Sequence, residues 1–252
     1  MSGPLAGRLA LVTGASRGIG ASVAAHMAKQ GARLVLAGRD AAALSRVALA
    51  VNELGSEALT VACDLRQAEE RARLFAAARE LGPLEILVNN AAALHAGPLV
   101  ELAPERWQEM LELNLGAVLA CCQAGLREML PRRRGVIVNV ASVSGVPGVE
   151  KLPGLVAYAA TKGGVLALSE ALAAEVAPAG VRVVAVSPGA VQTDMLRSVA
   201  PDAVPGAMTP GQVGRVIAWL AGDDAAAVNQ TNVVVWGPPA TSGEGEGAGG
   251  AP

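Results

Sequence analysis

Tyr158 and Lys162 are the residues of this sequence whose types and spacing most directly suggest acid–base chemistry. The apolar stretch around them, from about 154 to 177, is typical of one helix, and residues four apart lie on the same helix face. A free tyrosine titrates at a pKa of about 10, and a neighbouring ammonium lowers that pKa. The pair therefore predicts proton transfer between a carbonyl and an alcohol. Taken alone, so short a motif more often marks a half-exposed tyrosine beside a solvated lysine.

A glycine-rich turn is the second chemical feature. Thr13–Gly20 joins the first predicted strand to the first predicted helix, with the spacing Gly14-x-x-x-Gly18-x-Gly20. Glycine permits a tight turn and a close approach of a phosphate to the backbone, and a helix N-terminus favours an anion. The turn therefore predicts binding of a dinucleotide pyrophosphate.

The end of the second predicted strand indicates which dinucleotide binds. An acidic residue about 20 positions beyond the turn binds a ribose 2′-hydroxyl, whereas an arginine there accommodates a 2′-phosphate. This sequence has Gly38 followed by Arg39, with Arg17 in the turn as a second cation. We assign Asp40 to the cap of the next helix. NADP(H) is therefore expected as the coenzyme in preference to NAD(H).

The elements that must position these residues alternate between strands and helices. The pattern predicts strands at Leu9–Thr13, Arg33–Ala37, Ala58–Cys63, Ile86–Asn89, Val136–Val140, Val181–Val186 and Asn232–Val235. It predicts helices at Gly20–Gln30, Ala41–Leu54, Gln67–Leu81, Pro104–Leu130, Leu155–Ala177 and Thr209–Leu220. Continuous apolar strands between helices indicate an α/β fold, a single Rossmann-type doubly wound parallel sheet of about seven strands. We expect one domain over residues 1–240 and a disordered Gly/Ala/Glu-rich tail over 241–252.

Composition excludes several other classes of function. The net charge of −2, with both signs interspersed, does not favour a nucleic-acid partner or an anionic membrane surface, and no apolar run approaches a membrane span. Two isolated histidines and three cysteines without ligand spacing predict no metal site and no disulfide framework. We expect a soluble, cytoplasmic enzyme. The basic run Arg132–Arg134 is expected to be a solvated loop.

Further motifs complete a family resemblance. Cys63-Asp64-Leu65 follows the third strand, Asn89-Asn90-Ala91 the fourth, and Ser187-Pro188-Gly189-Ala190-Val191-Gln192-Thr193 the sixth. Together with the glycine turn, Asn114, Ser142, Tyr158 and Lys162, and in this order, they make the sequence similar to the short-chain dehydrogenases/reductases from about Leu5 to Val235. The resemblance implies a catalytic set of Asn114, Ser142, Tyr158 and Lys162. It implies coenzyme contacts from Gly14, Ser16, Arg17, Gly18, Ile19, Gly20, Arg39, Asp64, Leu65, Asn90, Ala91, Tyr158, Lys162, Pro188, Gly189, Val191 and Thr193.

The family mechanism assigns a role to each catalytic residue. Tyr158 would donate a proton to the substrate oxygen, Lys162 would lower the phenol pKa and bind the nicotinamide ribose, and Ser142 would hydrogen-bond the substrate oxygen. Asn114 would hold a water that relays protons to Lys162. His95 is either a surface-loop residue or a border of the substrate pocket.

Three departures from the family pattern are visible. Ala92 replaces the last glycine of Asn-Asn-Ala-Gly. Ser142 and Tyr158 are sixteen residues apart, about three more than the resemblance leads us to expect. The segment from Asp194 to Met208 is short for a lid over a long acyl substrate.

Three functions remain open at this stage. The first is NADPH-dependent reduction of a small or medium ketone or aldehyde. The second is reduction of a 3-oxoacyl group on an acidic acyl carrier protein, for which Arg127 and Arg132–Arg134 are the candidate basic patch. The third is a non-catalytic NADP(H)-binding regulator, against which the intact catalytic set argues. The resemblance also implies a homotetramer or homodimer that pairs through the two long helices. These helices carry Val118, Leu119, Val165, Leu166 and Leu172, more apolar surface than one sheet face needs.

Overall fold

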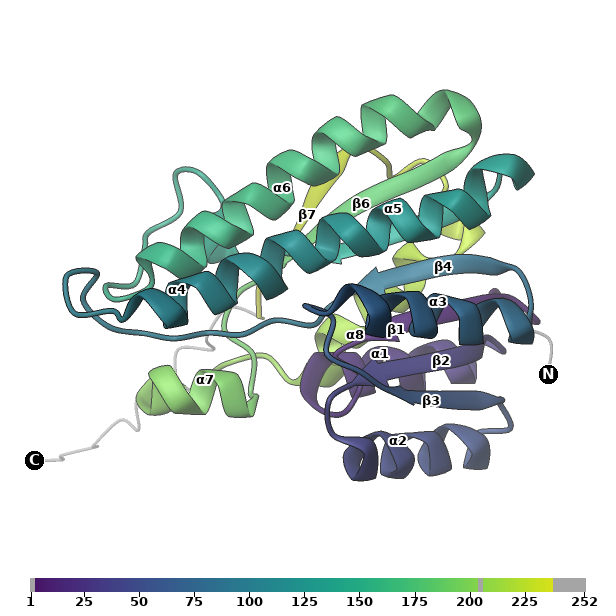
Figure 1. Cartoon of the computed structure of the whole chain (residues 1–252), viewed down its shortest axis with the longest axis horizontal. Helices are drawn as coiled ribbons and strands as arrows, with labels where there is room; N and C mark the ends of the chain where they lie inside the picture. The colour runs from purple at the N-terminus through teal and green to yellow at the C-terminus, as the bar shows by residue number, and fades with distance from the viewer. Residues whose placement is uncertain (1–2, 204–205, 238–252) are drawn as a thin grey trace, which may run out of the picture.

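A seven-stranded parallel sheet forms the centre of the molecule, with helices on both of its faces (Figure 1). The computed structural model describes residues 3–203 and 206–237. The strand order is β3-β2-β1-β4-β5-β6-β7, so the chain reverses its direction of travel across the sheet between β1 and β4. In open α/β sheets a ligand binds at the carboxyl ends of the strands beside this reversal.

The predicted strands are confirmed to within a few residues. They are β1 (Leu9–Thr13), β2 (Arg33–Gly38), β3 (Ala58–Ala62), β4 (Leu84–Asn89), β5 (Gly135–Val140), β6 (Val181–Pro188) and β7 (Thr231–Val235). Successive side chains of a strand point to opposite faces, so both faces of a buried strand must be apolar. In β1, Ala10 and Val12 pack on one face, and Leu9 and Leu11 pack on the other.

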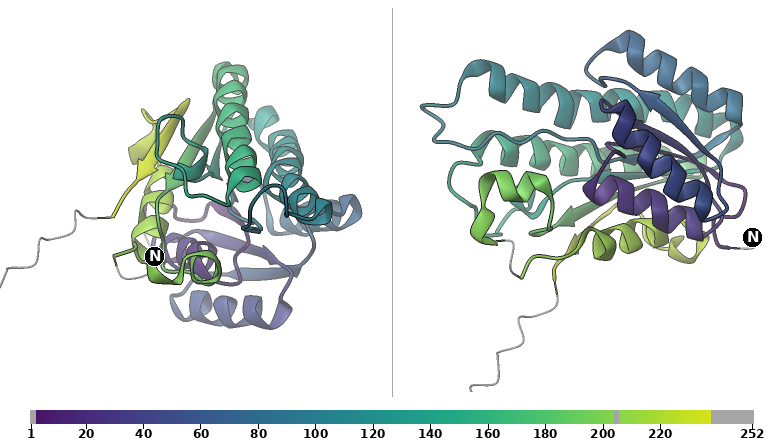
Figure 2. Two further views of the ribbon diagram at one scale, coloured as in Figure 1. Left: turned by 90° about the vertical axis from the view of Figure 1, so that its left-hand side faces the viewer. Right: turned by 90° about the horizontal axis from the view of Figure 1, so that it is seen from below.

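Two helical layers cover the sheet. One face packs against α1 (Gly18–Lys29), α2 (Ala41–Glu53) and α8 (Pro210–Leu220). The other face packs against α3 (Ala68–Leu81), α5 (Ala117–Met129) and α6 (Val156–Val176). Figure 2 shows the two layers on either side of the strands. Short 3₁₀ turns occur at Leu130–Arg132, Val143–Gly145, Ala177–Ala179, Pro201–Ala203 and Asp223–Ala225.

The fourth predicted helix differs from expectation, because it is interrupted. Residues 104–130 form α4 (Pro104–Leu111), a π-helical turn (Glu112–Gly116) and α5, followed by a 3₁₀ turn. The π turn holds Asn114, and such turns are frequent at functional sites. A short helix that the sequence pattern did not predict, α7 (Asp194–Val199), lies between β6 and α8.

The expectation of excess apolar surface on the long helices is largely wrong. Val118, Val165 and Leu166 are buried in the core that α5 and α6 share with the sheet. Leu172 is partly buried against the same core, and only Leu119 of the five is largely exposed, at 56%.

The expected disordered tail over 241–252 lies outside the described residues. None of the described helices has the length and apolar character needed to cross a bilayer. No cluster of three or more metal-ligand side chains occurs within residues 3–203 and 206–237.

Candidate active site

One large cleft, of about 1020 Å³, opens at the carboxyl ends of the strands. The loops after β1 through β6 and the N-terminal part of α6 all contribute to its wall. All but two of the candidate residues line it. Gly20, the last residue of the glycine turn, is buried against the backbone of Gly14. Asn114 lies behind the wall of the cleft and is fully buried.

The glycine turn has the backbone geometry that its sequence predicts. Gly14 and Gly18 have positive φ angles, of 64° and 55°. A Cβ on Gly14 would lie 2.8 Å from both the Ala91 Cα and the Asn90 side-chain nitrogen, so a side chain does not fit there. The Asn90 amide donates to the Thr13 carbonyl at 2.9 Å and to the Gly14 carbonyl at 3.2 Å. The loop after β4 therefore fixes the shape of the turn, which leaves a backbone cradle suited to a pyrophosphate.

Arg17, in the glycine turn, and Arg39, just after β2, both line the cleft. Their guanidinium groups are exposed, and the ion pairs that they make within the described residues are long, Arg17 with Asp194 and Arg39 with Glu109, each at 3.8 Å. The assignment of Asp40 is confirmed, because its carboxylate accepts the Ala43 N–H at 2.9 Å and caps α2. Two cations without an opposing carboxylate at Gly38 fit a 2′-phosphate.

A charged cluster that the sequence pattern did not predict lies beside these residues. Glu109 on α4 lines the cleft, lies 2.8 Å from the His95 imidazole and 3.5 Å from Arg66, and also faces Arg39. The His95 hydrogen bond holds the pKa of the Glu109 carboxyl below its usual value. Asp64 is engaged by Arg66 at 2.6 Å, and this contact lowers the Asp64 pKa. Glu109 is 14 or more residues away in sequence from each of its partners, and no local motif signals these contacts.

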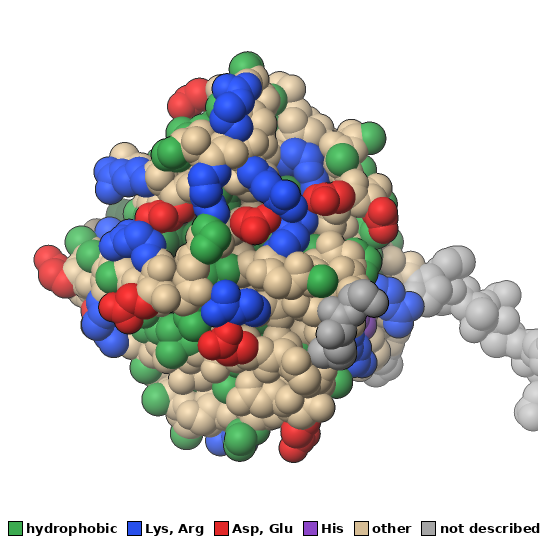
Figure 3. Space-filling view, turned by 90° about the vertical axis from the view of Figure 1, so that its right-hand side faces the viewer, with side chains coloured by type: hydrophobic (Ala, Val, Ile, Leu, Met, Phe, Trp, Pro, Cys, Tyr) green, Lys and Arg blue, Asp and Glu red, His purple; other side chains and the backbone are tan. Residues whose placement is uncertain are grey.

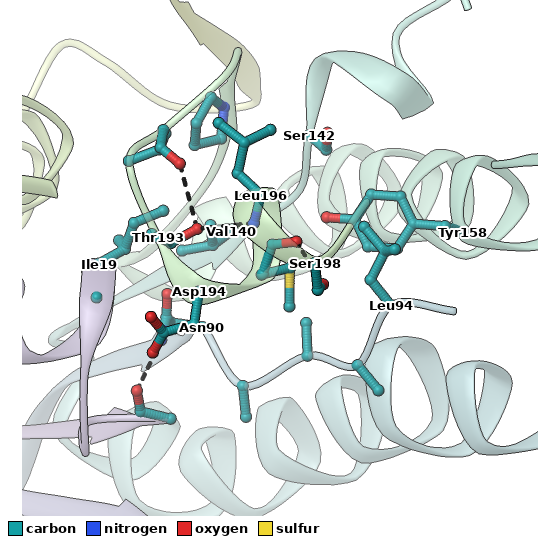
Figure 4. A pocket seen from close by; sticks show the side chains of 18 of the residues that line it. Ile19, Asn90, Leu94, Val140, Ser142, Tyr158, Thr193, Asp194, Leu196 and Ser198 are labelled. Atoms are coloured by element: carbon teal, nitrogen blue, oxygen red, sulfur yellow. Dashed lines mark hydrogen bonds between the residues drawn. The ribbon is translucent and has the colours of Figure 1, made fainter. Parts of the chain in front are cut away.

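Tyr158 and Lys162 lie on the face of α6 that points into the cleft, and both are buried. The Lys162 ammonium is 5.7 Å from the centre of the Tyr158 ring and donates to the Val140 carbonyl at 2.7 Å. Ser142 follows β5, the strand that ends at Val140, and its hydroxyl accepts the Ser144 N–H at 3.1 Å. Figure 4 shows the Tyr158 hydroxyl and Ser142 at one side of the cleft, facing Leu196 and Ser198 of α7.

The ionisation of this pair differs from the sequence-based expectation. Burial raises the pKa of Tyr158 to about 12, and a hydrogen bond with Ser142 only partly opposes that rise. Burial also lowers the pKa of Lys162 to about 8. The prediction that Lys162 pulls the phenol pKa down is therefore wrong for the protein's own groups, because desolvation disfavours both charged forms. Tyr158 is protonated at neutral pH, as an unperturbed tyrosine is, and this is the form that a proton donor needs.

Asn114 connects two parts of the site instead of facing the cleft. Its side-chain oxygen accepts the Ala93 N–H at 2.8 Å, and its nitrogen donates to the Ala93 carbonyl at 2.9 Å and to the Thr161 hydroxyl at 3.2 Å. The Thr161 hydroxyl in turn donates to the Tyr158 carbonyl at 2.8 Å. Asn114 thus ties the loop after β4 to the turn of α6 that carries Tyr158.

The segment after β6 forms the remaining wall. Pro188, Gly189, Val191 and Thr193 all line the cleft. Val191 pairs with Met208, and the Thr193 hydroxyl caps α7 by accepting the Leu196 N–H at 3.3 Å. A Cβ on Gly18 would lie 3.3 Å from the Thr193 methyl group, so this segment closes over the glycine turn.

Comparison with known proteins decides the family. The sequence model of the short chain dehydrogenase family matches residues 8–203. The chain belongs to the short-chain dehydrogenase family. It is therefore an oxidoreductase with a nicotinamide coenzyme.

Relatives within this short-chain dehydrogenase family differ in substrate. The chain is 37% identical to gluconate 5-dehydrogenase of Gluconobacter oxydans, over 79% of this chain and 77% of the relative. It is 33% identical to 3-oxoacyl-(acyl-carrier-protein) reductase FabG of Escherichia coli, over 87% of this chain and 92% of the relative. A variant of actinorhodin polyketide ketoreductase, solved with NADPH, superposes with a TM-score of 0.86 at 34% identity, covering 94% of this chain and 98% of that chain.

Proposed function

We propose that this short-chain dehydrogenase uses NADPH to reduce a ketone or aldehyde to an alcohol. The proposal rests on one observation. Tyr158, Lys162 and Ser142 line the same cleft as the glycine turn, Arg17 and Arg39. NADPH, when bound, supplies the hydride, and the residues of the chain supply the proton, the orientation and the electrostatics.

Each catalytic side chain has a role that its surroundings support. Tyr158, protonated at neutral pH, donates its proton to the substrate oxygen. Ser142 donates a hydrogen bond to the same oxygen, where negative charge develops. Lys162 holds α6 against the end of β5 and provides a positive charge beside the phenol. Asn114 positions the turn of α6 that carries Tyr158, because it bonds both to Thr161 on that turn and to Ala93 in the loop after β4.

NADP(H) is proposed in preference to NAD(H). Arg17 and Arg39 would bind the 2′-phosphate, while Asp64, Leu65, Asn90 and Ala91 would border the adenosine half. The remaining wall, at Pro188, Gly189, Val191 and Thr193, would meet the nicotinamide.

An acyl carrier protein is the less favoured partner. Arg132–Arg134 precede β5, and Arg127 lies in the last turn of α5, so this basic group lies at the end of the sheet opposite the cleft. Arg132 and Arg133 donate to backbone carbonyls of Leu84 and Pro178, and Arg134 pairs with Glu85 at 2.9 Å. Figure 3 shows acidic side chains interspersed among the arginines of that face. A carrier docked there would present its acyl group away from Tyr158.

We also propose a reducing compartment, the cytoplasm, and assembly into a dimer or tetramer. Cys63, Cys121 and Cys122 are free and buried, and burial raises the pKa of both helix thiols to about 12. Leu119 on α5 and Val156 on α6 present apolar surface to solvent, which a second copy would cover.

The test is steady-state oxidation of NADPH with a panel of ketones, aldehydes, keto sugars and acyl thioesters. Turnover of free carbonyl compounds is expected. Activity restricted to acyl-carrier-protein thioesters would support the alternative, and binding of NADPH without turnover of any member would support the regulator.

A further inference from the structure

The loop between Ser142 and Tyr158 is fastened at two points. The Lys151 ammonium donates to the carbonyls of Val143, at 3.3 Å, and Val146, so the loop is closed onto the 3₁₀ turn that follows Ser142. Further on, the Gly154 carbonyl accepts the Gly97 N–H at 3.0 Å. These contacts tie the loop to the 3₁₀ turn after Ser142 and to the loop that follows β4.

These fastenings place aliphatic side chains in the cleft beside Tyr158. Leu155 is buried with Met110 and the Tyr158 ring, and Leu94 packs against the same group. Leu152, next to Lys151, lines the cleft although it is 59% exposed. Leu94 and Tyr158 lie together in Figure 4. One wall beside the proton donor is therefore apolar.

The facing wall is apolar as well. Met195, Leu196 and Val199 of the short helix α7 line the cleft. We call the space between Leu94, Leu152, Leu155, Met195, Leu196 and Val199 the substrate compartment.

The cations that line the cleft beside α7 and the loop after β4 have acidic neighbours. Arg197 and Arg17 both face Asp194, at 2.7 and 3.8 Å, and His95 faces Glu109. Lys162 donates to the Val140 carbonyl. A substrate carboxylate near Arg197 or His95 would therefore also meet the like charge of Asp194 or Glu109.

Two serines border the compartment. Ser198 donates to the Met195 carbonyl at 2.8 Å, and Ser142 accepts the Ser144 N–H, which leaves the Ser142 hydrogen for the substrate oxygen. A substrate hydroxyl left without a partner costs at least about tenfold in affinity, whereas each buried methylene adds about fourfold.

We propose that the substrate is a ketone with apolar aliphatic or alicyclic substituents, and that Leu152 is a residue that selects for them. This inference rests on the proposed NADPH-dependent reductase function. It sets the protein apart from relatives that act on polyhydroxylated acids, since a hydroxyl placed against the aliphatic side chains of the compartment would lose its water partners.

The test compares kcat/KM with NADPH for methyl ketones from butan-2-one to decan-2-one, for 5-oxohexanoate and for 5-ketogluconate. We expect kcat/KM to rise about fourfold per added methylene over the first members of the series. Hexan-2-one should exceed 5-ketogluconate by at least about 100-fold, because two or more hydroxyls of 5-ketogluconate would lose their water partners against the aliphatic side chains. 5-Oxohexanoate separates the effect of the carboxylate from that of the hydroxyls.

Leu152→Gln tests the selecting residue at nearly constant volume. It should lower kcat/KM for octan-2-one at least about tenfold, change butan-2-one much less, and leave the NADPH Kd unchanged. The matched control is Leu49→Gln, because Leu49 is 63% exposed on α2, away from the cleft, and no change is expected.

The possible failures are distinguishable. No turnover of any carbonyl compound would overturn the proposed function itself. Turnover with a flat chain-length series, or with 5-ketogluconate as the better substrate, would overturn only the inference about substrate class. An equal loss for all ketones in Leu152→Gln would show a structural effect and overturn the assignment of Leu152.

Discussion

The ammonium of Lys162 donates a hydrogen bond to the backbone carbonyl of Val140 across 2.7 Å. Val140 is the last residue of β5, two positions before Ser142, and Lys162 is one helical turn beyond Tyr158. This single contact therefore joins the strand that positions the serine to the helix that positions the tyrosine. The lysine has a structural role in the site in addition to its charge.

The buried ammonium predicts a specific pH dependence of stability. The Lys162 pKa falls from 10.5 to about 8 on folding, so between these values the unfolded chain binds more protons. Stability rises with pH wherever the unfolded state binds more protons. The free energy of unfolding should therefore rise from pH 8 to 10.5 relative to that of Lys162→Met, by up to about 3 kcal/mol. Urea unfolding of both proteins across this range measures the difference, and parallel curves would contradict the prediction.

Tyr158→Phe should remove the proton donor while keeping the buried ring. General acid catalysis contributes roughly 100-fold to 10,000-fold, so kcat should fall by at least about 100-fold. Because the ring still packs against Leu155 and Met110, the NADPH Kd and the melting temperature should stay close to those of the parent. Turnover at the parental rate would disprove the role assigned to Tyr158.

Gly38→Asp and Arg39→Ala should both shift preference from NADPH toward NADH. A Cβ on Gly38 meets its nearest atoms, in Leu44 and Ser16, at 3.6 and 3.7 Å, so a side chain fits there. Loss of one charge-assisted contact should reduce the ratio of kcat/KM for NADPH to that for NADH by about tenfold or more. Arg46→Ala, an exposed arginine on α2, is the control. An unchanged ratio in both variants would argue that other groups select the coenzyme.

Glu109→Gln should tighten NADPH binding. Glu109 faces Arg39 at 3.8 Å and so competes with a 2′-phosphate for the guanidinium. An exposed pair of this kind contributes up to about 1 kcal/mol, so the NADPH Kd should fall by about two- to fivefold and the NADH Kd should change little. Fluorescence titration measures both constants, with Glu105→Gln, an exposed position on the same helix, as control. Weaker NADPH binding would instead show that Glu109 supports Arg39.

Leu119→Glu should weaken self-association. Leu119 is the apolar residue of α5 most exposed to solvent, and a charge there would have to be desolvated in a helix-to-helix interface. We expect a smaller species by light scattering at micromolar concentration and a lower melting temperature. Leu49→Gln, on the opposite helical layer, should leave the mass unchanged. A parent protein that is already monomeric and fully active would refute the proposed assembly.

The sequence by itself determined the parts of this protein that depend on local pattern. Apolar strands that alternate with amphipathic helices predict a parallel sheet, because strands covered on both faces must be apolar throughout. The glycine turn and the spacing of Tyr158 and Lys162 reveal the site because close backbone approach and helical periodicity are local properties. Asp40 was assigned correctly for the same reason, since an N-cap acts on residues three positions away.

Only the tertiary structure decided the contacts between distant segments and the environment they create. Glu109 meets His95, Arg39 and Arg66 because three loops converge at the carboxyl ends of the strands. Asn114, in the π turn between α4 and α5, bonds to Ala93 and Thr161 instead of facing the cleft. The shift in the Tyr158 pKa has the opposite sign to the one expected from its neighbour, since desolvation depends on every atom packed around the phenol. Burial is a property of the whole fold, and the spacing of two residues does not contain it.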